Sequence, residues 1–465
     1  MQIISPQFVL FAAVTLAVYY LLARRAQNIW LLLASYFFYV TIRWEYALVA
    51  FLVTLINFFI AKKVSSRNWL ALGLTVNLGS FAALKLISSP YGPGLVGLTR
   101  LPVPTDALGL LLPIGFSFYI LQAISYLLDI HRGQAQPAQT FVDFALYLTY
   151  FPKLLAGPIE RPARFLPRLE ADRRVDGAAL ARGVGLILVG LVRKVIIADR
   201  INALIPATVF SDPASFSSLE KMIGLLVFIF GLYNDFQGYT TIVRGLSGLF
   251  GIELEPNFRQ PFFAQSVSDF WTRWHISLSF WLRDYIFLPF RRWLMQRRWP
   301  MWIATSAPPL VTMLASGFWH GAYAAILVWG FVHGLYLILE QLLRFNRNAS
   351  VGRLRATFTA LFVFSAISLT FVFFAAPSLR ASFNYLTGLF AFTSGLSAPL
   401  PLIDLLPAIV VSFWFDWQES KHGTDSFFMK WKPSAQAWGF ALALWLVFLF
   451  LGPQAGLVTF VYQGF

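Results

Sequence analysis

The feature that most constrains this chain is a series of long apolar stretches that recurs along its whole length. A helix of about 20 apolar residues crosses the hydrocarbon core of a bilayer. Only 12% of the residues are charged, whereas soluble domains carry about 25%. The sequence therefore predicts an all-α polytopic membrane protein. The candidate membrane spans are residues 6–23, 28–43, 46–61, 68–87, 108–129, 183–203, 219–236, 303–319, 322–340, 356–376, 401–415 and 436–452.

The basic residues indicate how these helices are oriented. Thirty-six Lys and Arg against 21 Asp and Glu give a net charge of +15, and loops rich in Lys and Arg stay on the cytoplasmic side. The basic clusters lie at residues 24–25, 62–67, 132–182, 259–298, 344–355 and 421–432. This rule places both termini and the loops Ser88–Asp106 and Ile205–Ser218 outside. The charge is thus explained by topology, and no nucleic-acid partner is expected.

The stretches 303–319 and 322–340 are short and meet at Trp319-His320-Gly321. They form either two full spans or one re-entrant hairpin, and both give an even number of crossings. Non-helical backbone at membrane depth occurs only where it is buried in protein or lines a wet cavity. We therefore expect a cavity that reaches His320.

Residues 265–290 fit no span. Apolar side chains recur there at spacings of three and four, which is typical of an amphipathic helix. They are Phe270, Trp274, Leu278, Trp281, Tyr285 and Leu288. Asp269 and Arg273, four residues apart, are expected to pair on the other face. The pattern predicts one helix at or just below the cytoplasmic interface.

Two histidines, His275 and His320, lie in these apolar surroundings. An ionisable side chain inside a membrane is costly and indicates a functional site. The alternative is a core histidine bonded to a backbone carbonyl. Burial favours the neutral imidazole, which accepts a proton and suits general-base chemistry. The chain has no cysteine, which excludes disulfides and a thiolate nucleophile.

Four tracts, in this order, resemble the membrane-bound O-acyltransferase (MBOAT) family. They are YFPKLLAGPIERPARF, YNDFQGYTTIVRGLSGLFGIELEPNFRQPF, FWTRWHISLSFWLRDYIF and GFWHG. The chain is most similar to the bacterial branch whose members acetylate alginate or transfer D-alanine to teichoic acids. The resemblance implies an MBOAT fold with about 10–12 membrane helices, re-entrant segments and a central tunnel. It covers residues 110–345 as the core of a single integral-membrane domain, 1–465.

The resemblance also implies roles for particular residues. His320 corresponds to the catalytic histidine, and His275 to the second histidine that lines the reaction tunnel. Asp235 falls on an acidic position of the family, and Trp274 and Trp319 adjoin the two histidines as supporting residues. Thr241 and Arg244 depart from the pattern of the branch, which leaves the substrate open.

The chain ends in Thr-Phe-Val-Tyr-Gln-Gly-Phe. This sequence resembles a C-terminal acyl motif of the same branch, in which the tyrosine accepts the acyl group. Tyr462 is then an acyl acceptor within an extracytoplasmic tail, 455–465, because a tyrosine hydroxyl is a plausible carrier in a chain without cysteine. The alternative is an aromatic anchor at the membrane interface.

The activity that the resemblance implies is O-acyl transfer at the bacterial cytoplasmic membrane. The donor is a cytoplasmic acyl thioester, such as acetyl-CoA or an acyl carrier protein, and no cofactor or metal is bound permanently. The acceptor is a cell-surface polysaccharide, reached directly or through an extracytoplasmic acyltransferase or esterase-like partner. Acetyl is the favoured group and D-alanyl the alternative. Outside the enzyme class, the alternative functions are a proton-coupled transporter or flippase and a structural scaffold.

Overall fold

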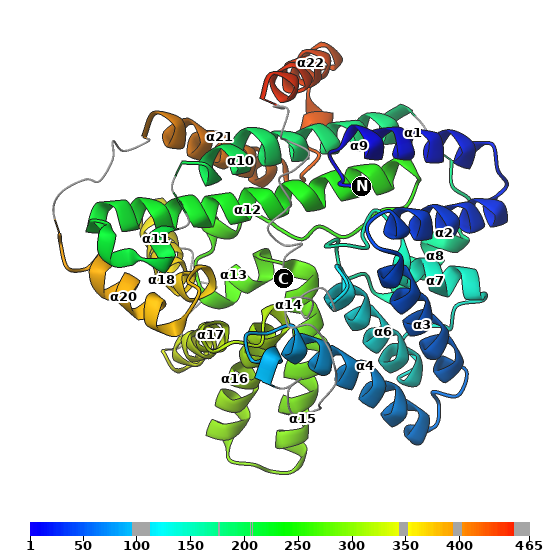
Figure 1. Cartoon of the computed structure of the whole chain (residues 1–465), viewed down its shortest axis with the longest axis horizontal. Coiled ribbons are helices and arrows are strands. Elements are labelled where there is room, and N and C mark those ends of the chain that lie inside the picture. The colour runs from blue at the N-terminus through cyan, green and yellow to red at the C-terminus, as the bar shows by residue number, and fades with distance from the viewer. Residues whose placement is uncertain are drawn as a thin grey trace. The chain divides into compact units, whose positions relative to one another are not determined.

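The computed structural model describes residues 1–94, 112–174, 177–204, 206, 208–343, 352–393 and 402–450. These residues form helices and loops and contain no strand (Figure 1). They divide into two compact units. The first comprises Met1–Val192, Gly238–Pro256 and Phe428–Phe465, and the second Arg193–Gln237 and Asn257–Phe427. The continuous helix α12, Ser218–Leu249, contributes to both.

The first unit is built from apolar helices joined by short turns. Its helices are α1 (Pro6–Tyr20), α2 (Arg24–Val40), α3 (Trp44–Ala61), α4 (Arg67–Ile87), α6 (Phe116–His131), α7 (Phe141–Thr149), α8 (Pro162–Glu170), α9 (Gly177–Leu191) and α22 (Pro433–Phe450). The start of α1 shows why these boundaries fall where they do. Ser5 caps the helix by accepting a hydrogen bond from the N–H of Phe8, and Pro6 occupies the first turn, where its missing N–H costs nothing.

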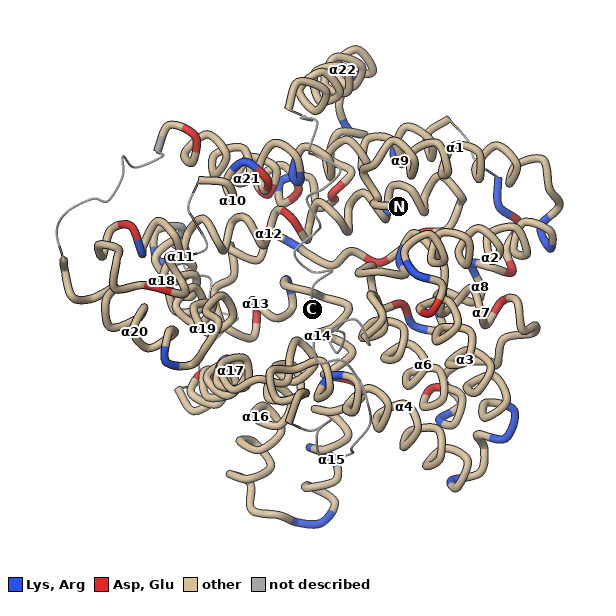
Figure 2. The backbone as a smooth tube through the Cα atoms, viewed as in Figure 1, with Lys and Arg blue, Asp and Glu red and all other residues tan. Residues whose placement is uncertain are grey.

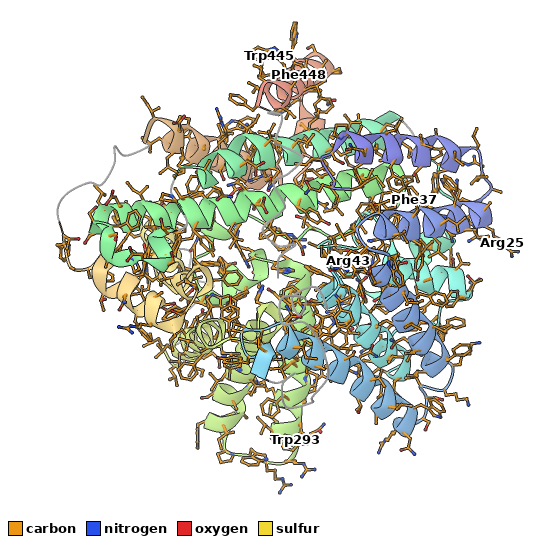
Figure 3. The ribbon with its side chains drawn as sticks, viewed as in Figure 1. Arg25, Phe37, Arg43, Trp293, Trp445 and Phe448 are labelled. Atoms are coloured by element: carbon orange, nitrogen blue, oxygen red, sulfur yellow. The ribbon has the colours of Figure 1, made fainter. Side chains whose placement is uncertain are left out.

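The outer faces of these helices carry large apolar side chains. Trp445 and Phe448 on α22 are exposed and point away from the ribbon (Figure 3), and Phe37 on α2 is exposed as well. Arg25 and Arg43 lie at the two ends of α2. An exposed apolar band of this kind between cations is the surface that a bilayer covers.

The second unit contains the segment with the motif histidines. Two π-helical turns, Val192–Ala198 and Arg283–Phe287, interrupt its helices. Besides the first part of α12, its helices are α10 (Asp199–Asn202), α11 (Thr208–Ser211), α13 (Val267–Arg273), α14 (Ile276–Leu282), α15 (Leu288–Gln296), α16 (Met301–His320), α17 (Ala324–Leu342), α18 (Arg353–Thr370), α19 (Val372–Ala375), α20 (Leu379–Leu389) and α21 (Leu402–His422). Arg297 and Arg298 lie in the loop that joins α15 and α16, which is coloured for basic residues in Figure 2.

Helices α16 and α17 pack against each other along their length. Glycines make this approach possible: a Cβ atom on Gly317 would lie 2.6 Å from the carbonyl oxygen of Ile326, and one on Gly330 would lie 2.3 Å from that of Met313. The helix α16 continues to His320, and only Gly321–Tyr323 separate it from α17. A bend is therefore present where it was predicted, but it lies at residues 321–323, so that Trp319 and His320 belong to the last turn of α16.

Among the described residues, five helical segments are long and apolar enough to cross a membrane. They are Trp44–Ala61, Arg67–Ile87, Ala324–Leu342, Leu354–Ala375 and Pro433–Phe450. Each overlaps a predicted span. Four helix ends differ from the predicted spans by more than a few residues. Helix α6 begins at Phe116 rather than near residue 108, and α9 begins at Gly177 rather than near 183. Helix α12 runs through Leu249 rather than ending near 236, and α21 passes residue 415 and ends at His422. The all-α, multi-pass membrane architecture is confirmed.

Candidate functional site

The segment that carries His275 is not the single helix that its periodicity predicts. Helix α13 ends at Arg273 and α14 starts at Ile276, because His275 adopts a left-handed conformation (φ 43°, ψ 53°). The N–H of Ile276 bonds to the carbonyl of Asn257 at 2.8 Å instead of to the preceding helical turn. The predicted continuous helix over 265–290 was therefore wrong. The predicted ion pair is present, with Arg273 Nε 2.8 Å from Asp269 Oδ1.

The break turns the His275 ring into the interior of the second unit. The residue is 1% exposed. Its ring lies edge-on to Phe236 of α12 at 4.9 Å between centroids, and to Trp319 of α16 at 5.6 Å. Burial lowers the pKa of His275 to about 3. The imidazole is therefore neutral at physiological pH and can donate a hydrogen bond through one ring nitrogen.

His320 is the last residue of α16 and is 4% exposed. Its ring is surrounded edge-on by three aromatic rings: Trp319 at 4.8 Å, Phe374 at 5.1 Å and Trp329 at 5.5 Å. The ring of Trp319 thus contacts both motif histidines. The structure brings His275, Trp319 and His320 together in one buried cluster within the second unit.

A third histidine extends this cluster. His333 Nε2 lies 2.8 Å from the hydroxyl oxygen of Thr370, and its ring lies 4.8 Å from that of Trp329. His333 is fully buried. A side chain held in this way has a packing role, and it offers a matched control for substitutions at His320.

The other predicted site residues lie nearby but make different contacts. Trp274 is buried between aromatic rings, with Phe258 at 5.1 Å and Phe270 at 5.5 Å. Asp235 is fully buried, and its Oδ1 lies 2.5 Å from Lys194 Nζ. Asp235 therefore neutralises a buried cation, while the next residue, Phe236, contacts His275. Tyr462 and the tail 455–465 lie outside the described residues.

The sequence reading missed a buried group of charged side chains in the second unit. Arg193 is fully buried and lies 2.7 Å from Asp416 and 3.0 Å from Glu419. Tyr233 donates to the same Asp416 carboxylate at 2.8 Å. The sequence feature that could have indicated this group is the pair Arg193-Lys194 inside an apolar stretch. Removing one member of a buried ion pair leaves the other charge uncompensated, so these residues hold α12 and α21 in place.

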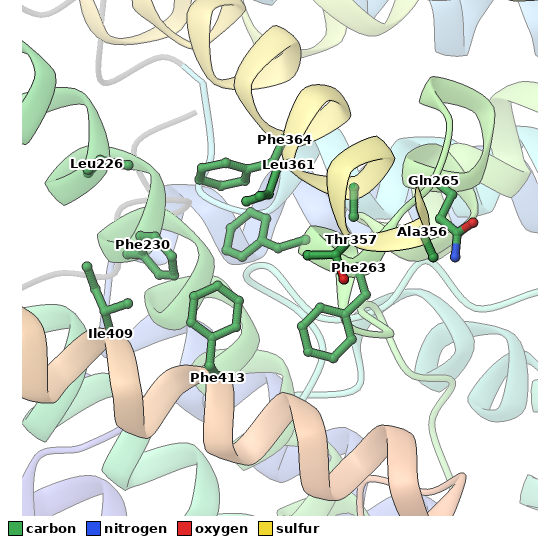
Figure 4. Close-up of a pocket in the computed structure, with 12 residues that line it drawn as sticks. Leu226, Phe230, Phe263, Gln265, Ala356, Thr357, Leu361, Phe364, Ile409 and Phe413 are labelled. Atoms are coloured by element: carbon green, nitrogen blue, oxygen red, sulfur yellow. The ribbon is translucent and has the colours of Figure 1, made fainter. Parts of the chain in front are cut away.

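The described residues of the second unit enclose cavities, of which two are relevant to the site. One, of about 600 Å³, lies between α12, α18 and α21, and Phe230, Phe364 and Phe413 point into it (Figure 4). Its lining is apolar apart from Gln265 and Thr357, so it suits an apolar occupant rather than a phosphorylated donor.

The other cavity has a volume of about 390 Å³ and includes Arg283, Ser279 and Thr312 in its lining. Trp271 also lines it, and the Trp271 ring lies 5.8 Å from Trp329, which in turn contacts His320. Neither histidine lines either cavity, and the tunnel to His320 stays a prediction. Among the described residues, no three His, Asp or Glu side chains gather as metal ligands would.

Comparison with known proteins identifies the family. The family model described as MBOAT, membrane-bound O-acyltransferase, matches residues 138–379. The chain is 32% identical to the probable alginate O-acetylase AlgI of Azotobacter vinelandii, over 82% of this chain and 76% of that protein. It is 29% identical to the peptidoglycan O-acetyltransferase of Helicobacter pylori, over 83% and 79%, and 30% identical to the teichoic acid D-alanyltransferase of Bacillus subtilis, over 48% and 58%. The chain belongs to the membrane-bound O-acyltransferase family and is an O-acyltransferase.

Proposed function

We propose that this enzyme transfers an acetyl group from a cytoplasmic thioester toward a hydroxyl of an extracytoplasmic polysaccharide, with His320 as the general base. The observation that carries the proposal is that His275 and His320 are both buried and that the rings of both contact the ring of Trp319. Two imidazoles beside one buried ring can divide base and electrostatic work.

The reaction needs only these groups and the two substrates. His320 removes the proton from the acceptor hydroxyl as its oxygen attacks the thioester carbonyl. The neutral His275 donates a hydrogen bond to the oxyanion that develops. The tetrahedral intermediate then collapses, the carbon–sulfur bond breaks, and the thiolate takes the proton from the His320 imidazolium.

The cavity that contains Arg283 supports a thioester donor that bears phosphate, such as acetyl-CoA or an acyl carrier protein. The side chain of Arg283 is about half exposed, and its Nε lies 2.8 Å from Asp284 Oδ1. Arginine is the preferred partner of phosphate oxygens. Trp271, which lines this cavity, contacts Trp329, and Trp329 contacts His320, so two aromatic side chains separate the cavity from the proposed base.

We further propose that Tyr462 receives the acyl group and passes it to an extracytoplasmic acyltransferase or esterase-like partner. Such a relay fits a membrane enzyme whose polymer acceptor lies outside the cytoplasmic membrane. The names of the A. vinelandii and H. pylori relatives favour acetyl as the group transferred. The name of the B. subtilis relative supports D-alanyl transfer as the second candidate.

The test compares His320→Gln with His333→Gln in bacterial cells that carry this chain as their only copy. Exported polysaccharide is treated with mild alkali, and the released acetate and D-alanine are quantified. We expect His320→Gln to remove the esters and His333→Gln to keep most of them, at equal amounts of inserted protein. Ester formation at the unaltered rate in His320→Gln contradicts the base role, and release of D-alanine instead of acetate selects the second candidate.

A further inference from the structure

The break between α13 and α14 leaves a helix start that needs outside support. The first N–H groups of any helix have no partner within it. The residue at the cap position of α14 is His275, and its side chain does not cap the helix. Its ring is turned toward Phe236 and Trp319 instead.

Asn257 supplies the cap from 20 residues earlier in the chain. Its carbonyl oxygen accepts from the N–H of Ile276 at 2.8 Å, and its side-chain Oδ1 accepts from the N–H of Ser277 at 3.2 Å. Because the N–H of Ser277 is a donor, the side-chain amide of Asn257 must turn its oxygen toward the helix. Asn257 is 1% exposed, so water does not replace these bonds.

The same segment also holds the other side of the break. The N–H of Arg259 donates to the carbonyl of Arg273 at 2.9 Å. Between these two bonds, the ring of Phe258 packs against Trp274 at 5.1 Å and against Phe236 at 5.2 Å. The backbone on both sides of His275 is thereby fixed by residues 257–259, in a conformation that costs a non-glycine residue free energy.

We propose that Asn257 is a positioning residue for the acyl-transfer reaction, which caps α14 in place of residue 275 and so directs the His275 imidazole toward Trp319 and His320. This role rests on the proposed function. It differs from a general contribution to folding because it acts only through the His275 ring. Replacing the Asn257 side chain removes only the Oδ1 acceptor of the Ser277 N–H, while the backbone bonds of Ile276 and Arg259 remain. We expect the unsatisfied start of α14 to shift, so that the His275 ring, the proposed oxyanion donor, moves away from its productive position.

A double-mutant cycle separates positioning of the His275 ring from a general contribution to folding. Initial rates of ester formation on exported polysaccharide are measured after induction of the chain, for the unaltered protein, Asn257→Ala, His275→Ala and the double variant. Misplacing a catalytic group by about 1 Å costs up to about 100-fold, so we expect Asn257→Ala to lose between about 10-fold and about 100-fold. We expect the double variant to be no slower than His275→Ala alone.

Two further variants control for stability. Ser266 caps α13, since its Oγ accepts from the N–H of Asp269 at 3.0 Å, and it is buried like Asn257. Ser266→Ala should lower the thermal midpoint about as much as Asn257→Ala and leave the rate near that of the unaltered protein. Asn257→Asp keeps the Oδ1 acceptor beside a helix N-terminus, and we expect it to restore most of the rate.

Rate losses that multiply in the double variant overturn the positioning role, as does an equal loss in Ser266→Ala. If His275→Ala has no measurable rate, Asn257→Asp decides the question, and an Asp variant as slow as the Ala variant contradicts the proposal. Absence of esters from cells with the unaltered chain overturns the proposed function and, with it, this inference. A rate unchanged by His275→Ala overturns the positioning role of Asn257 and the oxyanion role of His275, while acyl transfer itself stands.

Discussion

At the scale of single residues, the neutral state of His275 has a measurable consequence. Burial lowers its pKa from 6.5 to about 3, so between these values the unfolded chain binds more protons than the folded one. Stability therefore falls as the pH drops through this window, by at most about 1.4 kcal/mol per pH unit. We expect the thermal midpoint of the unaltered protein to drop more between pH 7.5 and pH 5 than that of His275→Gln. Parallel losses in the two proteins would contradict a buried, neutral His275.

The relay through Tyr462 is also a question about one oxygen atom. Tyr462→Phe removes the hydroxyl that would carry the acyl group and keeps the aromatic ring. We expect polysaccharide esters to fall to background while the protein inserts normally, and mass spectrometry of the C-terminal peptide to lose an acyl adduct present in the unaltered chain. Full ester formation in Tyr462→Phe would leave the tail with an anchoring role only.

At the scale of helices, the pairing of α16 with α17 positions His320. A methyl group on Gly330 would lie 2.3 Å from the Met313 carbonyl oxygen, so Gly330→Ala must separate the two helices. We expect a stability loss of about 1–3 kcal/mol, typical of an overpacked core, and a reduced rate of ester formation. Gly79→Ala in α4 is the control, because nothing lies within 4 Å of its added methyl group. Equal thermal midpoints in the two variants would contradict close packing at Gly330.

The helices also show what the sequence can and cannot predict. His320 and the bend after it were found because an imidazole and glycines interrupt an apolar run. The periodicity over 265–290 correctly paired Asp269 with Arg273, but it predicted one helix where His275 breaks the backbone. Periodicity describes the spacing of side chains, whereas the break depends on N–H groups that bond to Asn257, a distant residue.

A buried charge marks another limit of prediction from sequence, at the end of the span 401–415. The predicted span 401–415 ends just before Asp416 and includes Asp404. In the structure α21 continues to His422, and Asp416 is paired with Arg193. Only the tertiary fold brings that partner within reach.

At the scale of the whole molecule, the absence of cysteine makes the predicted orientation directly testable. Gln296 and Tyr91 are exposed, the first beside the basic loop after α15 and the second in the loop predicted to lie outside. With a membrane-impermeant maleimide on intact cells, we expect Tyr91→Cys to be labelled. Gln296→Cys should react only after the membrane is opened. Labelling of Gln296→Cys in intact cells would reverse the orientation and place the Arg283 cavity on the wrong side for a cytoplasmic donor.

The central claim is that the buried imidazole of His320 activates a hydroxyl toward a thioester delivered from the opposite side of the membrane. The most direct measurement uses the purified chain in proteoliposomes, with radiolabelled acetyl-CoA on the face that carries the Arg283 cavity and de-esterified polysaccharide, together with any soluble partner, on the other. We predict alkali-labile label on the polysaccharide with the unaltered chain and with His333→Gln, and none with His320→Gln. Equal labelling with His320→Gln would contradict the account.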